Sequence, residues 1–305
     1  MDYVLSTNHL TKKYRRFTAL DSLDMHIPKG AIYGFVGKNG AGKTTLIRII
    51  CGLQEPTNGG YTLYGKKNLS PEITKARSRM GAVVETPSIY LNMTAEENLK
   101  QQFQILGIPS YDEIPGLLSL VGLEPSSIKK KKARNFSLGM RQRLGIAIAL
   151  SGHPDFLALD EPINGLDPEG IVEMRELILK LNQERAITVL ISSHILDELS
   201  KLATHFGFID HGQMVKELSA ADLENQCRKC IRVTVSDTER LSQALEKNDI
   251  PYEITGYGQA DIFSDIPLTK LVGMLNETGC ELLSAADQDE SLESYYIKLL
   301  GGAKK

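Results

Sequence analysis

The chain has 305 residues, which is long enough for two domains. Because 42% of them are hydrophobic and 24% charged, it can bury a core without disulfide bonds or structural metals. Its formal net charge of −3 excludes the overall positive field that holds nucleic acid, and no nucleic-acid partner is expected. The N-terminus lacks a signal-peptide pattern, and no segment approaches the roughly 18 apolar residues of a spanning helix. We therefore expect a cytosolic chain that reaches a membrane only through a partner.

The four cysteines are too few and too scattered for a disulfide framework, which favours a reducing compartment. Cys227 and Cys230 form one CxxC pair, but a zinc site needs about four ligands and no second pair follows. The simpler interpretation is two ordinary thiols, and no metal is assigned to them.

The first predicted elements are a strand over 31–36, a glycine-rich loop and a helix with the sequence TTLIRIICGL. A hairpin over GGYTLYG and a buried strand over MGAVVE follow. Further along, apolar runs at 156–160 and 187–192 enclose the helical pattern IVEMRELILKLNQ, which is typical of a right-handed βαβ crossover. The core sheet is therefore expected to be largely parallel.

A mainly helical stretch is predicted from Thr94 to about residue 150. Thr94 and Glu97 have the spacing of a capping box, which marks the start of a helix. The apolar residues expected on one face of that helix are Leu99, Phe103 and Leu106.

The last part of the chain predicts a separate small domain. FGFIDHGQMV indicates a hairpin that turns at His211 and Gly212, and the polar stretch after it places a boundary near residue 220. Beyond it the order is strand, helix, strand, strand, helix, strand, with a closing helix over SLESYYIKLLG, which suggests a ferredoxin-like α+β domain. The predicted domains are 1–220 and 221–305.

The segment from Gly37 to Thr44 fits the pattern G-x-x-x-x-G-K-[ST] and lies between the predicted strand and helix, as this phosphate loop requires. Its glycines let backbone N–H groups surround a β-phosphate, Lys43 reaches the β- and γ-phosphates, and Thr44 can ligate Mg²⁺. The dinucleotide spacing G-x-G-x-x-G is absent. The residues expected to bind ATP here are Gly37, Lys38, Asn39, Gly40, Ala41, Gly42, Lys43, Thr44 and Thr45.

Three further polar residues follow apolar strands. Asp160 ends the run FLALD, where it can hold Mg²⁺ through water, and Glu161 can polarise the attacking water as a general base. An acid pair alone is more often a helix cap or a solvated turn, but the phosphate loop weakens that interpretation. His194 follows the strand ITVLISS, at the edge where ligands gather in such sheets, and can meet a γ-phosphate.

The segment NFSLGMRQR, at 135–143, resembles the signature motif of ABC ATPases. The resemblance covers about residues 3–220 and includes the phosphate loop, the acid pair, NGLD at 164–167 and the histidine in the family's order. Leu138 and Met140 depart from the family pattern, whereas Ser137 and Gly139 keep it. The implied fold is an α/β phosphate-loop NTPase with a mostly parallel core sheet, an antiparallel β subdomain and a helical subdomain, followed by the small α+β domain.

The resemblance also implies how the site is completed. Ser137 precedes a helix as its N-cap, so its hydroxyl and the positive helix end can grip a γ-phosphate, which the family places on the opposite subunit. Two copies would form a homodimer that sandwiches two ATP molecules, with membrane-spanning permease subunits as partners at the cytoplasmic face of the membrane. Gly139 would join that contact, Asp167 would link the paired sites, and Tyr14, ahead of the first strand pair, would stack on adenine.

Glu85 stands where most ABC ATPases carry the glutamine of a loop that senses Mg²⁺ and the membrane partner. Its carboxylate could bind Mg²⁺ through water but would repel phosphate, so slower or differently coupled activity is expected. Together with SLGMRQRLGIA, it resembles the bacitracin-resistance and lantibiotic-immunity exporter branch, by analogy with which the cargo would be a peptide antibiotic. The stretch from Glu85 to about Lys132 should receive the coupling helix of the membrane subunit. The implied metal residues are Thr44, Glu85 and Asp160.

Lys129 to Lys132 and Arg134 form a basic run before the signature. A solvated helix face is the simpler interpretation, and attraction to anionic lipid or nucleotide is the alternative. A soluble ABC-type ATPase acting on ribosomes or DNA is the competing function, but only one phosphate loop and no sustained heptads occur. The C-terminal domain could equally serve regulation, dimer contact or stability.

Overall fold

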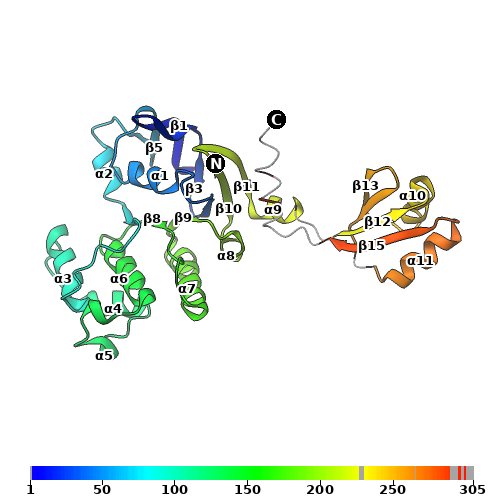
Figure 1. The fold of residues 1–305 in the computed structure, drawn as a ribbon. Helices are drawn as coiled ribbons and strands as arrows, with labels where there is room; N and C mark the ends of the chain where they lie inside the picture. The colour runs from blue at the N-terminus through cyan, green and yellow to red at the C-terminus, as the bar shows by residue number, and fades with distance from the viewer. Residues whose placement is uncertain (1, 227–229, 265, 289–294, 297–298, 300–305) are drawn as a thin grey trace. The chain divides into compact units, whose positions relative to one another are not determined.

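The structure is a computed structural model that describes the chain apart from residues 1, 227–229, 265, 289–294, 297–298 and 300–305. The chain divides into two compact units, Met1–Ala220 and Ala221–Lys305. Figure 1 labels most of the elements of both units. Cys227 and most of the predicted closing helix lie outside the described residues.

A six-stranded sheet forms the centre of the first unit, in the order β11-β10-β4-β9-β8-β7. Every neighbouring pair is parallel except β10 with β11, so the expectation of a largely parallel sheet is confirmed. Because β4, β8 and β9 are buried along their whole length, their sequences are continuous apolar runs rather than alternating ones. The strand bounds are β4 Ile32–Val36, β7 Met80–Val83, β8 Phe156–Asp160, β9 Thr188–Ser193, β10 His205–Asp210 and β11 Gln213–Ser219.

An antiparallel five-stranded sheet packs with this unit's core, and its first three strands were not predicted as separate elements. The pairing of β1 with β2 shifts register between Leu10 and Lys12, and His9 has a positive φ of 45°, so the apolar alternation that marks a strand is broken. The bounds are β1 Tyr3–Tyr14, β2 Phe17–Leu23, β3 His26–Pro28, β5 Asn58–Leu63 and β6 Lys66–Lys67.

The predicted helical stretch is present, and Figure 1 shows α3 to α6 gathered away from the antiparallel sheet. Thr94 and Glu97 make the predicted capping box, with Leu99 and Phe103 buried. Leu106, expected on the same face, is 45% exposed. It is the last helical residue and faces Gly152, which offers no side chain to cover it.

The helices of the first unit are short, apart from three of twelve or more residues. Their bounds are α1 Lys43–Ile50, α2 Ile73–Arg77, α3 Ala95–Leu106, α4 Ile114–Leu120, α5 Pro125–Ile128, the 3₁₀ turn η1 Ala133–Asn135, α6 Leu138–Leu150, α7 Pro168–Arg185 and α8 Leu196–Ser200. The segment that leaves this unit is α9 Ala220–Gln226. The mostly parallel sheet, the antiparallel sheet and the helical group together confirm the predicted fold.

The second unit has the predicted βαββαβ order, and its sheet order β13-β14-β12-β15 is antiparallel throughout. Its own core includes Val233, Leu241, Ile262, Leu271 and Leu275. Among the described residues, no helix has the length and hydropathy needed to cross a bilayer, and no cluster of metal-ligand side chains occurs. The bounds are β12 Cys230–Val235, α10 Thr238–Glu246, β13 Tyr252–Gly256, β14 Gln259–Ile262, α11 Leu268–Glu277 and β15 Leu282–Gln288.

Candidate active site

The glycine-rich loop joins the end of β4 to the start of α1, as the sequence predicted. Gly42 has a φ of 113°, and a Cβ there would lie 2.5 Å from the carbonyl oxygen of Ala19. At Gly37 a Cβ would lie 2.8 Å from the carbonyl oxygen of Ile209. Both positions therefore require glycine, and the loop's close approach to its neighbours fixes its curvature.

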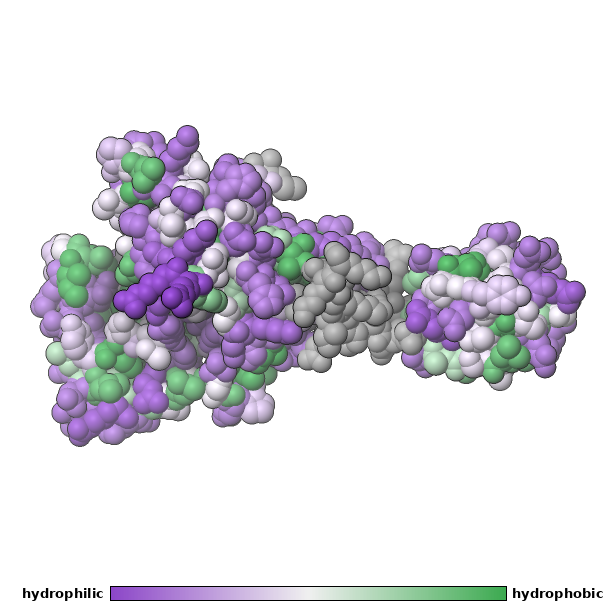
Figure 2. Space-filling view, turned by 45° about the horizontal axis from the view of Figure 1, so that its top comes forward, coloured by the Kyte–Doolittle hydropathy of each residue, from purple (hydrophilic) through white to green (hydrophobic). Residues whose placement is uncertain are grey.

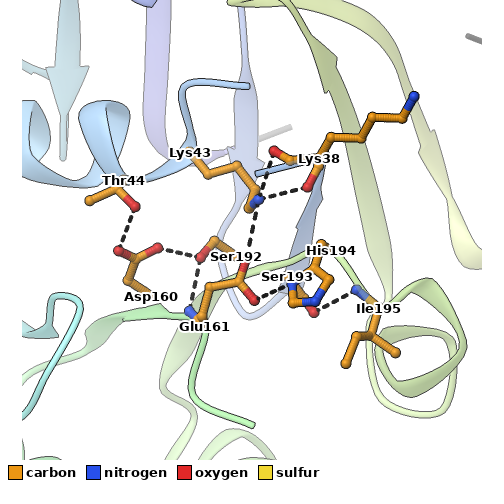
Figure 3. Close-up of polar contacts among 10 residues, drawn as sticks. Lys38, Lys43, Thr44, Asp160, Glu161, Ser192, Ser193, His194 and Ile195 are labelled. Atoms are coloured by element: carbon orange, nitrogen blue, oxygen red, sulfur yellow. Dashed lines mark hydrogen bonds and ion pairs between the residues drawn. The ribbon is translucent and has the colours of Figure 1, made fainter. Parts of the chain in front are cut away.

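Lys43 directs its ammonium group into this loop (Figure 3). The side chain is only 5% exposed, and its Nζ donates to the carbonyl oxygens of Gly37 at 2.6 Å and Lys38 at 3.2 Å. Its third contact is an ion pair with Glu161 Oε1 at 3.1 Å. A buried cation is stable only when it is paired and hydrogen-bonded, and here it is held where phosphate oxygens would meet it.

Asp160 is 2% exposed, and both of its oxygens accept hydrogen bonds from hydroxyl groups. Thr44 Oγ1 donates to Oδ2 at 2.8 Å, and Ser192 Oγ donates to Oδ1 at 2.6 Å. These three residues come from α1, β8 and β9, so the parallel sheet brings them together. A carboxylate beside a hydroxyl is the oxygen donor set that Mg²⁺ prefers, and the pair Thr44 and Asp160 fits that ion.

Glu161 lies between Lys43 and His194 in Figure 3. One carboxylate oxygen faces Lys43, and the other lies 2.9 Å from His194 Nδ1. Its backbone N–H donates to Ser192 Oγ at 3.0 Å, and its φ is 49°, in the left-handed region that a non-glycine residue adopts at a cost. The strained backbone thus directs the carboxylate of Glu161 toward the loop, where a general base is needed.

The signature residues lie apart from this cluster within one chain. Ser137 caps α6, its Oγ accepting from the N–H of Met140 at 3.2 Å, and Asp167 caps α7 by accepting from Gly170 N at 3.1 Å. Gly139 and Leu138 pack near Leu166 and Gly165, so the two segments support each other. Among the described residues, no hydrogen bond or ion pair joins either capping side chain to the phosphate loop.

Tyr14 is the last residue of β1 rather than a residue ahead of the first strand pair, so that placement was wrong. It pairs with Phe17 across the β1–β2 turn, which the sequence did not mark as a hairpin. Its hydroxyl donates to Gln54, and Lys12 Nζ lies 5.3 Å from the ring centroid. The ring is partly exposed, as a stacking surface must be.

Glu85 forms an ion pair with Nη2 of Arg48 at 2.6 Å. Arg48 lies on α1, one turn after Thr44. Its side chain is 56% exposed, and no hydrogen bond or ion pair within the described chain joins it to Thr44 or Asp160. Glu85 and Arg48 also line a pocket of about 440 Å³ with Leu53 and Pro87. Sequence reasoning missed Arg48 and Ser192, although a serine inside the apolar run ITVLIS is a visible signal for the latter.

This fold and this cluster define a phosphate-loop NTPase: a cradle with a buried lysine, an aspartate tied to the loop threonine, and a glutamate and histidine at adjoining strand ends. The ABC transporter family profile matches residues 20–164. The chain is 41% identical over 305 residues to the bacitracin transport ATP-binding protein BcrA of Bacillus licheniformis, covering 99% of both chains. It is also 41% identical to the lantibiotic transport ATP-binding protein SrtF of Streptococcus pyogenes, over 73% of this chain and 93% of SrtF.

Solved structures agree on the fold. The protein cbiO1 of Clostridium perfringens, part of the ABC transporter complex cbiONQ, matches with a TM-score of 0.65 and 25% identity, over 81% of this chain and 96% of its own. A dimeric bacterial ABC transporter cassette matches with a TM-score of 0.64 and 24% identity, over 71% of this chain and 98% of its own. The chain belongs to the ATP-binding subunits of ABC transporters and is an ATPase. The ribosome- or DNA-directed alternative is not favoured.

Proposed function

We propose that the chain is the motor of an exporter for a peptide antibiotic or a similar amphiphile, bound at the cytoplasmic face of the membrane to permease subunits. The similarity to bacitracin and lantibiotic transport proteins supports this substrate class. Residues 1–220 would form the ATPase domain and 221–305 an accessory domain. The pocket lined by Glu85 and Arg48 is a suitable receiving surface for a permease helix, because it is open and most of its other lining residues are apolar.

In the proposed mechanism, Lys43 and the loop N–H groups bind the β- and γ-phosphates, and Tyr14 stacks on adenine. Thr44 and Asp160 would hold Mg²⁺, which neutralises phosphate charge when bound. Glu161 accepts a proton from the attacking water, and His194 orients Glu161 through their 2.9 Å contact. Glu85 is a weaker candidate as a metal residue, since its carboxylate is already paired with Arg48.

Two copies would close head to tail, so that Ser137 and Gly139 of one face the ATP held by the other. The capped N-terminus of α6 supports this, because Ser137 is exposed and, within the described residues, no hydrogen bond joins it to the phosphate loop. Asp167, at the N-terminus of α7, would lie between the paired sites. ATP would thus close the dimer, and hydrolysis would reopen it.

The observation that carries the catalytic proposal is the position of Glu161 between Lys43 and His194. Glu161→Gln removes the base with little change in size and should lower ATP hydrolysis by about a hundredfold or more. ATP should then trap a dimer, measured by analytical ultracentrifugation with and without nucleotide. Glu184→Gln, the same change at an exposed position on α7, is the matched control. Hydrolysis at the wild-type rate in Glu161→Gln would refute the assignment of the base.

A further inference from the structure

The simpler interpretation of the basic run before the signature was a solvated helix face. The structure contradicts it, because the run does not lie on a helix. Helix α5 ends at Ile128, and Lys129 to Lys132 continue as a turn and an extended segment up to η1. Their side chains are exposed. The run is therefore a loop, and its position must be explained by tertiary contacts.

Backbone hydrogen bonds fix this loop against the segment 90–94. Ala133 N donates to Met93 O at 2.8 Å, and Arg134 N donates to Leu91 O at 2.9 Å. Lys132 and Thr94 form a β-bridge. The end of the loop, at Lys132 and Arg134, is therefore held against the segment that carries Tyr90 and Leu91, which are 55% and 49% exposed.

The charges of this loop are not neutralised by nearby acids. Within the described part of the chain, none of the four lysines or Arg134 forms an ion pair; Lys131 contacts Met140 Sδ at 3.8 Å and Arg134 contacts Asn92. The pKa of the Glu97 carboxyl is lowered mainly by the N–H of Thr94, which donates to it at 2.7 Å, and the charge of Lys132 makes only a small contribution. A concentrated positive field therefore remains in a chain whose net charge is −3.

Unpaired lysines beside an exposed tyrosine and leucine match an anionic membrane surface better than a protein groove. Lysines attract anionic headgroups, and an aromatic ring with an apolar neighbour settles at the headgroup level. Figure 2 shows a molecular face that is mainly hydrophilic, with apolar side chains in separate groups. We infer that Lys129–Lys132, Arg134, Tyr90 and Leu91 form a contact surface for anionic lipid headgroups, in addition to any contact with a permease.

The test is flotation of the full chain with phosphatidylcholine vesicles that contain either no phosphatidylglycerol or about a third of it. Wild type should bind only the anionic vesicles and should be released by 0.5 M salt, at which the Debye length is only about 4 Å. Replacing all four of Lys129 to Lys132 with glutamine should weaken binding by a hundredfold or more, at roughly fivefold per lysine. No binding of wild type to anionic vesicles would overturn the inference.

The matched control replaces Lys29, Lys67, Lys75 and Lys180 with glutamine. These lysines are exposed and form no ion pair within the described residues. Replacing them changes the net charge by the same amount as replacing Lys129 to Lys132. An equal loss in this control would mean that total charge, not this surface, drives binding, and would also refute the inference. A second variant covers the case that the fourfold lysine variant does not fold. It combines Tyr90→Ser with Leu91→Ser, leaves the lysines unchanged, and should weaken binding by a smaller factor.

Discussion

The polar contacts of the active site and those around Glu85 are built from the same kinds of group but differ in burial. Lys43 and Asp160 are 5% and 2% exposed, and the hydroxyls and carbonyls around them satisfy their charges. The ion pair of Glu85 with Arg48 is open to water, where screening leaves it little energy. One region is fixed before nucleotide arrives, and the other would be free to change partners if the proposed permease helix docked there.

The largest expected effect is at Asp160. Asp160→Asn replaces one charged acceptor with a donor that faces the hydroxyl of Thr44 or Ser192, and removes the charge proposed to hold Mg²⁺. Steady-state ATPase assays with Mg²⁺ should show a loss on the order of 10² to 10³. Asp249→Asn, at an exposed position in the other unit, should match wild type. A loss below tenfold at Asp160 would mean that burial of its carboxylate has no catalytic purpose.

Gly42→Ala tests whether the loop's curvature is enforced by packing. The new methyl would clash with Ala19 O, and its φ of 113° is strained for alanine, so unfolding free energy should fall by about 3 kcal/mol. Urea unfolding measures this. Gly30→Ala is a close control, since its φ of 78° is also positive but nothing lies within 4 Å, and should cost about 1 kcal/mol. Equal losses would show that backbone strain, not the contact with Ala19, sets the requirement.

The smallest effect is expected at Glu85. Glu85→Gln should change unfolding free energy by less than about 1 kcal/mol, because the side chains of the ion pair are 56% exposed at Glu85 and 35% at Arg48. ATPase activity of the isolated subunit should change by less than about fivefold, measured beside Arg48→Gln, which breaks the same pair from the other side. A change in activity as large as that of Asp160→Asn would show that Glu85 belongs to the catalytic cluster. It would contradict the lack of any contact between Glu85 and Thr44 or Asp160 within the described residues.

Features that depend on neighbours a few residues apart were predictable. The phosphate loop needs glycines, lysine and threonine between a strand and a helix, and the capping box of Thr94 and Glu97 and the turn at His211 and Gly212 are equally local. Each is marked by residues close together in the chain, so the sequence specifies them directly. The strand ends carrying Asp160, Glu161 and His194 were found for the same reason: a continuous apolar run stops at a polar residue.

Features decided by contacts between distant residues could not be predicted from the sequence. Leu106, which is 45% exposed, lies near Gly152, far along the chain, and the strand β1 was hidden by a register shift against β2. Likewise Ser192 reaches Asp160 and Arg48 captures Glu85 only because the sheet and α1 place them together. Sequence alone therefore determined the chemistry, namely a phosphate loop, an acid pair and a signature. Tertiary structure decided which charges are buried and which remain free, since burial depends on segments that meet only when the chain folds.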